Sequence, residues 1–229
     1  MEINADFSKR VVIHTPEVEW QDSPMKGVRR HMLDRVGGEV ARATSIVSYA
    51  PDSKFSPHVH TGGEEFIVLE GVLQDEHGDF PAGSYIRNPP ESKHTPGSES
   101  GCVIFVKLWQ FDLQDRQQVS ADMNQSKLIQ DATREGVQAT TLFSDERETV
   151  THEQWPANSQ VKIDASEGAE IFVLQGSFSE SKDHLKAQSW MRLPIGASFT
   201  ATTGESGAKV WVKTRHLQHV QGELDRLPV

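Results

Sequence analysis

Residues 58–102 read HVHTGGEEFIVLEGVLQDEHGDFPAGSYIRNPPESKHTPGSESGC, and this stretch decides the fold. It contains short apolar runs, such as residues 66–69, separated by the turn signals Thr61-Gly62-Gly63 and Pro81-Ala82-Gly83. Short apolar runs bounded by glycine and proline are typical of β-strands, and little helical periodicity is present. The sequence therefore predicts an all-β fold, either a sandwich or a small barrel.

The same pattern occurs a second time in the chain. Residues 64–71, EEFIVLEG, resemble residues 169–176, AEIFVLQG, at an offset of 105 residues, and Pro89 falls on Pro194 at that offset. Self-similarity at a fixed offset indicates a duplicated unit. We predict two homologous domains, residues 1–112 and 127–229, joined by a polar linker over residues 113–126.

A candidate metal site lies in the first copy. Residues two apart on a strand point to the same face, so the imidazoles of His58 and His60 can address one point. A neighbouring antiparallel strand would bring Glu64 beside them, and His94 follows after the next turns. Three imidazoles and one carboxylate favour a divalent transition metal, one per chain.

Three further residues are candidates for the surroundings of the metal. Strand alternation lets only one of Glu64 and Glu65 face the site, and the motif spacing favours Glu64. Glu65 would then orient a ligand imidazole or face solvent. Arg87 could hold an anion near the metal or be an exposed strand residue, and Tyr85 could line the cavity or lie outside it. No catalytic residue is identified.

The second copy lacks equivalents of the metal ligands. The offset of 105 residues places apolar side chains at all four positions, namely Ile163, Ala165, Ala169 and Phe199. None of these side chains can bind a metal. We therefore expect the second domain to keep the scaffold without the site.

Composition excludes several classes of protein. The chain has 23 Lys and Arg against 33 Asp and Glu, and its net charge of −10 disfavours nucleic-acid and anionic-membrane partners. No apolar run approaches the roughly 18 residues of a membrane span, and the first residues do not resemble a secretory signal. Cys102 is the only cysteine, which excludes an intramolecular disulfide and indicates a cytoplasmic protein. We expect Cys102 to be a buried core thiol.

The first copy resembles the cupin superfamily. His60, three residues, Glu64, six residues and Gly71 match the first cupin motif. The second motif is matched by Gly83, five residues, Pro89, one residue, Glu91, two residues and His94, with Glu91 where glycine is usual. More narrowly, the Gly-Glu-Glu, the Asp-Glu-His-Gly-Asp turn and the Pro-Pro-x-x-x-His-x-Pro run are similar to the cupin part of ChrR-type anti-sigma factors.

The resemblance implies a bicupin, that is, two tandem cupin barrels of the double-stranded β-helix or jelly-roll type. It assigns ligand roles to His58, His60, Glu64 and His94, with zinc as the favoured metal. It also implies a stress-responsive regulatory or sensor protein, with a sigma factor or another regulatory protein as partner. The first forty residues show no helical bundle and no cysteine, so we expect the sensor module without the sigma-binding domain.

A second function class stays open. Zinc with four protein ligands leaves no open coordination position, which suits a sensor. Iron, manganese or nickel would leave two positions for a small molecule and suit a dioxygenase acting on a small oxygenated compound. We also expect a homodimer, because β-sheet edges and the second copy without ligands offer contact surfaces.

Overall fold

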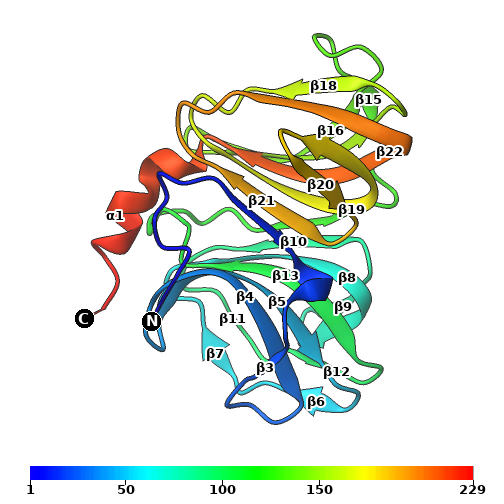
Figure 1. The fold of residues 1–229 in the computed structure, drawn as a ribbon. Helices are drawn as coiled ribbons and strands as arrows, with labels where there is room; N and C mark the ends of the chain where they lie inside the picture. The colour runs from blue at the N-terminus through cyan, green and yellow to red at the C-terminus, as the bar shows by residue number, and fades with distance from the viewer. Residues whose placement is uncertain (229) are drawn as a thin grey trace. The chain divides into compact units, whose positions relative to one another are not determined.

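The computed structural model describes residues 1–228, and their regular secondary structure is almost entirely antiparallel β-strand (Figure 1). The chain divides into two compact units. The first contains Met1–Ala5, Glu19–Gln125 and the segment from Gly222 on, and the second contains Asp6–Val18 and Ser126–Gln221. Both units are built from the duplicated strands expected from the sequence, so the fold is that of tandem cupin barrels.

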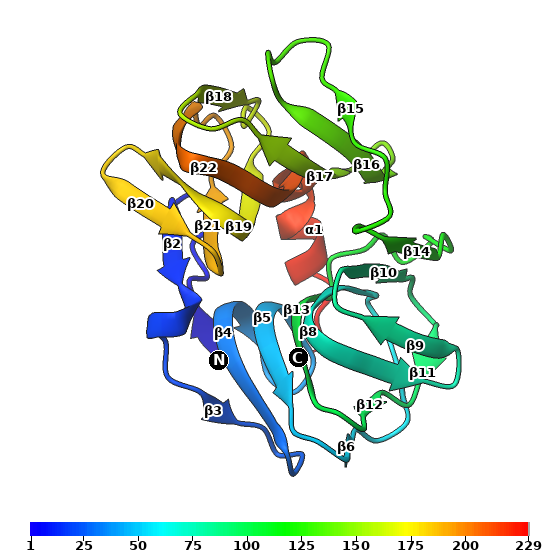
Figure 2. The ribbon, with the colours of Figure 1, turned by 90° about the vertical axis from the view of Figure 1, so that its right-hand side faces the viewer.

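The first unit is built around one long sheet in the order β1-β4-β5-β13-β8-β10-β14, of which Figure 2 shows the strands from β4 to β14. β7 and β11 form a separate two-stranded ribbon. Its apolar interior gathers side chains such as Tyr49, Phe66 and Ile104. The strands are β1 (Glu2–Ile3), β3 (Gln21–Asp22), β4 (Val28–Gly37), β5 (Ala41–Tyr49), β6 (Ser53–Lys54), β7 (His58–Val59), β8 (Glu64–Asp75), β9 (Gly78–Pro81), β10 (Ser84–Asn88), β11 (Lys93–His94), β12 (Gly97–Ser98), β13 (Cys102–Leu108) and β14 (Val119–Asp122).

The second unit repeats this plan in the order β15-β16-β17-β22-β19-β21-β2. Its strands are β2 (Val11–His14), β15 (Ile129–Gln130), β16 (Gln138–Ser144), β17 (Thr149–Trp155), β18 (Gln160–Ile163), β19 (Ala169–Glu180), β20 (Asp183–Lys186), β21 (Ser189–Leu193) and β22 (Phe199–Thr214). Two 3₁₀ turns, Thr15–Glu17 and His216–His219, and the short helix α1 (Val220–Leu224) complete the chain. No helix among the described residues is long and apolar enough to cross a membrane.

The duplication is visible in the strand boundaries. Strands β8, β9 and β10 begin and end 105 residues before β19, β20 and β21. This agreement follows from the shared spacing of turn residues, since the turns fix where each strand can start and stop. The two barrels therefore share one strand plan over their central hairpins.

The terminal segments do not follow the sequential division at residue 112. Strand β2 pairs with β21, so residues 6–18 belong to the second unit although they precede the first. The segment from Gly222 on belongs to the first unit. Within the stretch 113–126, expected to be a linker, β14 pairs with β10 from Ser84↔Asp122 to Arg87↔Val119. Alternation of apolar and polar residues predicts that a segment is a strand, but it does not predict which sheet edge that strand pairs with.

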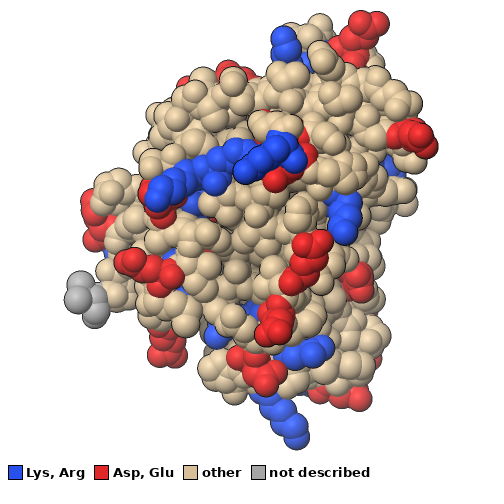
Figure 3. All heavy atoms as spheres, viewed as in Figure 1, with Lys and Arg blue, Asp and Glu red and all other residues tan. Residues whose placement is uncertain are grey.

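Charged side chains are mixed on the molecular surface. On the face drawn in Figure 3, acidic and basic side chains both occur, and a row of basic side chains there has acidic side chains beside it. Charges of both signs agree with the 23 Lys and Arg and 33 Asp and Glu of the sequence.

Candidate metal centre

Two small structural elements carry the predicted metal ligands. His58 lies on β7, and His60 follows directly after that strand. β7 pairs with β11 so that His58 stands opposite His94. Glu64 is the first residue of β8, where it pairs with Asn88 on β10. The ribbon of β7 and β11 thus supplies three imidazoles, and the long sheet supplies the carboxylate.

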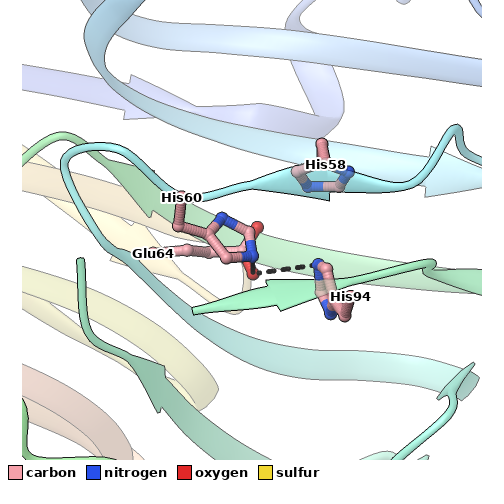
Figure 4. Close-up of side chains that lie close together, drawn as sticks. All are labelled: His58, His60, Glu64 and His94. Carbon is pink, nitrogen blue, oxygen red and sulfur yellow. Dashed lines mark ion pairs between the residues drawn. The ribbon is translucent and has the colours of Figure 1, made fainter. Parts of the chain in front are cut away.

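The four side chains converge on one point (Figure 4). One nitrogen or oxygen atom of each of His58, His60, Glu64 and His94 lies within 4.8 Å of the others. The Glu64 Oε2 atom is 3.5 Å from His60 Nε2 and 3.6 Å from His94 Nε2. His60, Glu64 and His94 are buried, while His58 is partly exposed. These separations are those of donors arranged around a shared cation.

Unpaired polar atoms at the centre of the cluster fit a metal ion. His60 Nε2 and His94 Nε2 are buried without a hydrogen-bond partner, a situation that costs about 1–3 kcal/mol per group. Burial raises the pKa of Glu64, and the neighbouring His94 and the hydrogen bond from Asn88 oppose that rise. A divalent cation would accept both nitrogen lone pairs and compensate the buried carboxylate. The donor set therefore suits a first-row transition metal.

Hydrogen bonds to the far ring atoms orient two of the imidazoles. His58 Nδ1 lies 2.8 Å from the carbonyl oxygen of Ser56, and His94 Nδ1 lies 2.9 Å from Asp75 Oδ2. Both partners are acceptors, so these bonds place the proton on Nδ1 and leave Nε2 as the lone-pair donor. Asn88 Nδ2 also donates to Glu64 Oε2 at 3.2 Å.

Burial keeps one ligand neutral. Desolvation, with a contribution from His58, lowers the pKa of His60 to about 4. A neutral imidazole is the form that binds metal, since a protonated ring has no free lone pair. His60 is therefore ready to act as a ligand throughout the neutral range.

Two glycines allow the turn between His60 and Glu64. A Cβ atom at Gly62 would lie 2.2 Å from the Trp109 ring, and one at Gly63 would lie 2.3 Å from the Phe111 ring. Gly63 also has a φ of +79°, which side chains other than glycine rarely adopt. Trp109 Nε1 donates to Thr61 Oγ1 at 3.2 Å. The aromatic pair after β13 thus covers the turn that spaces the ligands.

Glu65, Tyr85 and Arg87 do not lie with the metal ligands. Strand alternation turns Glu65 to the face opposite Glu64, where its Oε1 accepts a 2.6 Å hydrogen bond from the Tyr85 hydroxyl. Arg87 stands opposite Glu65 on β10, pairs with Asp115 and lies 4.0 Å from the Phe111 ring centroid. The sequence left a place beside the metal and a place away from it open for each residue. The structure places all three in a buried polar row on the other face of the sheet, so Glu65 and Arg87 are neither beside the ligands nor exposed.

The second unit fills the corresponding positions with apolar side chains. Ala165, Ala169 and Phe199 are buried in its core, and Ile163 packs against them. A charged ligand set there would lack any partner for its desolvated groups. At the positions that correspond to the metal ligands, the interior of the second barrel is therefore filled by apolar side chains.

Sequence reasoning missed Asp75. Its carboxylate is 4% exposed and contacts His94, yet the sequence marked it only as part of a hairpin turn. An acidic residue that opens a turn is common for local reasons. Only the three-dimensional path of β11 shows that the Asp75 carboxylate contacts His94.

Comparison with known proteins agrees with this architecture. A model of the ChrR cupin-like domain matches residues 8–112 and again residues 116–218. No curated protein sequence matches the chain.

Several solved structures share the fold. A candidate dioxygenase from Nostoc punctiforme PCC 73102 has 14% identity and a TM-score of 0.75, covering 92% of this chain and 84% of that chain. Protein Ylba from E. coli has 13% identity and a TM-score of 0.69, covering 92% and 93%. The pirin YhhW from Escherichia coli, solved with nickel(II), has 12% identity and a TM-score of 0.65, covering 90% and 98%. Such low identities establish a common fold, and the two matches to the family model establish more: the chain belongs to the ChrR cupin-like family, with one cupin domain in each half.

Proposed function

We propose that the protein binds one divalent transition metal per chain through His58, His60, Glu64 and His94. The observation that carries this proposal is the meeting of three imidazoles and a carboxylate within 4.8 Å, with two buried Nε2 atoms lacking any other partner. When bound, the ion would act as a Lewis acid and hold the β7–β11 ribbon against β8. The chain's own residues would fix the donor geometry through the hydrogen bonds from Asn88 and to Ser56 and Asp75.

We propose zinc as the metal and a regulatory role for the module. Four protein ligands complete a tetrahedron around zinc, and such a closed site couples metal loss to local unfolding. Membership of the ChrR cupin-like family supports this assignment. A cytoplasmic location, a homodimer and a regulatory protein partner, for which a sigma factor is one candidate, belong to the same proposal.

A metal-dependent oxygenase is the second candidate function. The observation that favours it is the partial exposure of His58, which leaves one side of the cluster accessible to a small molecule. With iron, manganese or nickel, four protein ligands would leave two coordination positions free. A candidate dioxygenase and a nickel-bound pirin share the fold of this chain, and this similarity supports the proposal of a metal-dependent oxygenase.

Elemental analysis of protein purified without added metal tests the proposal. We expect one transition-metal ion per chain in the wild type and in the control His184→Ala, an exposed histidine of the second unit. His60→Ala should contain less than a tenth of that amount. Equal metal content in all three proteins would overturn the ligand assignment.

Cobalt(II) substitution then separates the two functions. A closed site of four protein ligands gives the intense visible absorption of tetrahedral cobalt, whereas added water ligands give the weak bands of five- or six-coordinate cobalt. Intense bands support the sensor. Weak bands that change when small oxygenated compounds are added support the oxygenase.

A further inference from the structure

We propose that the turn between β8 and β9 is a clamp that positions the metal ligand His94. The clamp consists of Asp75, Glu76 and His77, and it contacts three successive residues on and after β11. This inference rests on the metal site proposed above and assigns positioning roles to three residues outside the ligand set.

Each clamp residue holds one residue of the facing segment. Asp75 Oδ2 accepts a hydrogen bond from His94 Nδ1 at 2.9 Å, and Glu76 Oε2 accepts one from the backbone N–H of Thr95 at 2.8 Å. His77 Nε2 donates to the carbonyl oxygen of Lys93 at 3.3 Å. The three bonds therefore fix the segment on both sides of the ligand and at the ligand itself.

The Asp75 carboxylate is held in turn. Its Oδ1 accepts a 2.7 Å hydrogen bond from the backbone N–H of His77, and the side chain is 4% exposed. A buried carboxylate with both oxygens bonded has little freedom to rotate. It thereby fixes the ring plane of His94 and keeps the proton on Nδ1, so that Nε2 is directed toward Glu64, 3.6 Å away.

β11 needs such a restraint because it is short. β7 and β11 have two residues each and pair only with one another in the described sheets. An isolated two-stranded ribbon is marginally stable in water. Backbone hydrogen bonds also join His60 to Ser92 and Glu91, and Phe55 to Pro96, but none of these fixes the ring of His94. The clamp adds the side-chain restraint that this ligand needs.

The second unit supplies an internal comparison. The offset of 105 residues places Glu180 and Ser181 at the positions of Asp75 and Glu76, and Phe199 at the position of His94. Glu180 there binds Arg10 at 2.6 Å and accepts a hydrogen bond from Ser181, so its carboxylate is used elsewhere. The copy without ligands has the hairpin, but its acidic residue serves a different contact.

The test compares Asp75→Ala and Asp75→Asn with Asp79→Ala, an exposed residue of the same hairpin whose side chain accepts a hydrogen bond from Gln74. Zinc affinity is measured by competition with a chromogenic chelator. We expect Asp75→Ala to weaken binding roughly 10- to 100-fold, Asp75→Asn to weaken it less because the amide oxygen still accepts, and Asp79→Ala to leave it unchanged. Glu76→Ala, at an exposed position, should weaken binding by a smaller factor.

A second readout needs no metal. Long-range ¹⁵N–¹H NMR of the metal-free protein reports which His94 ring nitrogen carries the proton. We expect Nδ1–H in the wild type and a loss of that preference in Asp75→Ala. Unchanged affinity together with an unchanged tautomer in Asp75→Ala would overturn the clamp. A wild type that binds no zinc but shows the Asp75-dependent tautomer would refute the metal site and leave the positioning contact intact.

Discussion

Glu65 and Glu170 occupy equivalent positions in the two halves of the chain, and each carboxylate accepts a hydrogen bond from an aromatic residue twenty positions later. Tyr85 donates to Glu65 at 2.6 Å, and Trp190 donates to Glu170 at 3.1 Å. A lysine and an arginine flank each glutamate on the neighbouring strands, Lys107 and Arg87 in one unit, Lys213 and Arg192 in the other. The second copy thus retains this buried charged row although it lacks the metal ligands.

Glu65→Ala should destabilise the protein without removing the metal. The substitution leaves the buried Tyr85 hydroxyl without its acceptor and removes the negative charge between two buried cations, at a cost of about 3–5 kcal/mol. Urea unfolding measures the loss, with the exposed Glu99→Ala as control. Glu64→Ala, by contrast, removes a metal ligand and should lose the metal. If folded Glu65→Ala also lacks metal, the assignment of the two glutamates to opposite faces is wrong.

The stability of the metal-free protein should fall as the pH drops from 6.5 to 4. Burial lowers the pKa of His60 from 6.5 to about 4, so the unfolded chain binds a proton in this range and the folded chain does not. The stabilisation is complete above pH 6.5 and is lost as the pH approaches 4, a change of about 3 kcal/mol. Urea midpoints of chelator-treated protein measure it. His60→Gln should show a shallower slope over this range, and an equal slope would contradict the assignment.

Gly62→Ala should disturb the metal centre through Trp109. The added Cβ would lie 2.2 Å from the indole ring, so the ring or the turn must move, at a cost of about 1–3 kcal/mol. Because the turn joins His60 to Glu64, zinc affinity should fall as well. Gly38→Ala is the matched control, since no atom lies within 4 Å of its Cβ position. Adding Trp109→Ala should recover part of the loss, and a purely additive double variant would exclude the steric explanation.

Cys102 should react slowly with alkylating reagents in the folded protein. Burial raises the pKa of its thiol from 9.0 to about 11, against a hydrogen bond with Ser98 that lowers it. The thiolate fraction at pH 8 is then about 100-fold smaller than in an unfolded chain, and access is limited as well. Iodoacetamide labelling followed by mass spectrometry, with and without urea, measures the ratio. Rapid labelling of the native protein would instead identify Cys102 as an exposed, reactive thiol.

Three of the four ligands could be predicted from local spacing, whereas His94 was assigned by its match to the second cupin motif. His58 and His60 share a face by strand alternation, and the glycines at positions 62 and 63 mark the turn that brings Glu64 back. The duplication was equally readable, since residues 64–71 resemble residues 169–176 and Pro89 falls on Pro194 at the same offset. In these cases the sequence spacing itself sets the geometry.

Contacts between distant segments could not be predicted in the same way. The role of Asp75 depends on the path of β11, nineteen residues later, and no periodic pattern records that path. For Arg87 the sequence left a place near the metal and an exposed strand position open. Its neighbours Asp115 and Phe111 come from the segment after β13, which neither prediction included. The membership of β2 in the second unit likewise depends on a pairing with β21 that local patterns do not encode.

The exchange of terminal segments has a consequence for how the chain can fold during synthesis. Arg42 is buried in the first unit, and the nearer of its two carboxylate partners, Glu223 at 2.8 Å, lies 181 residues further along. On the ribosome, the amino-terminal barrel therefore lacks this buried carboxylate partner until residue 223 has been translated. Residues 11–14 wait in the same way for β21. The first barrel is therefore completed only after the strands of the second have been translated, and a cut near residue 112 would deprive both of a segment they need.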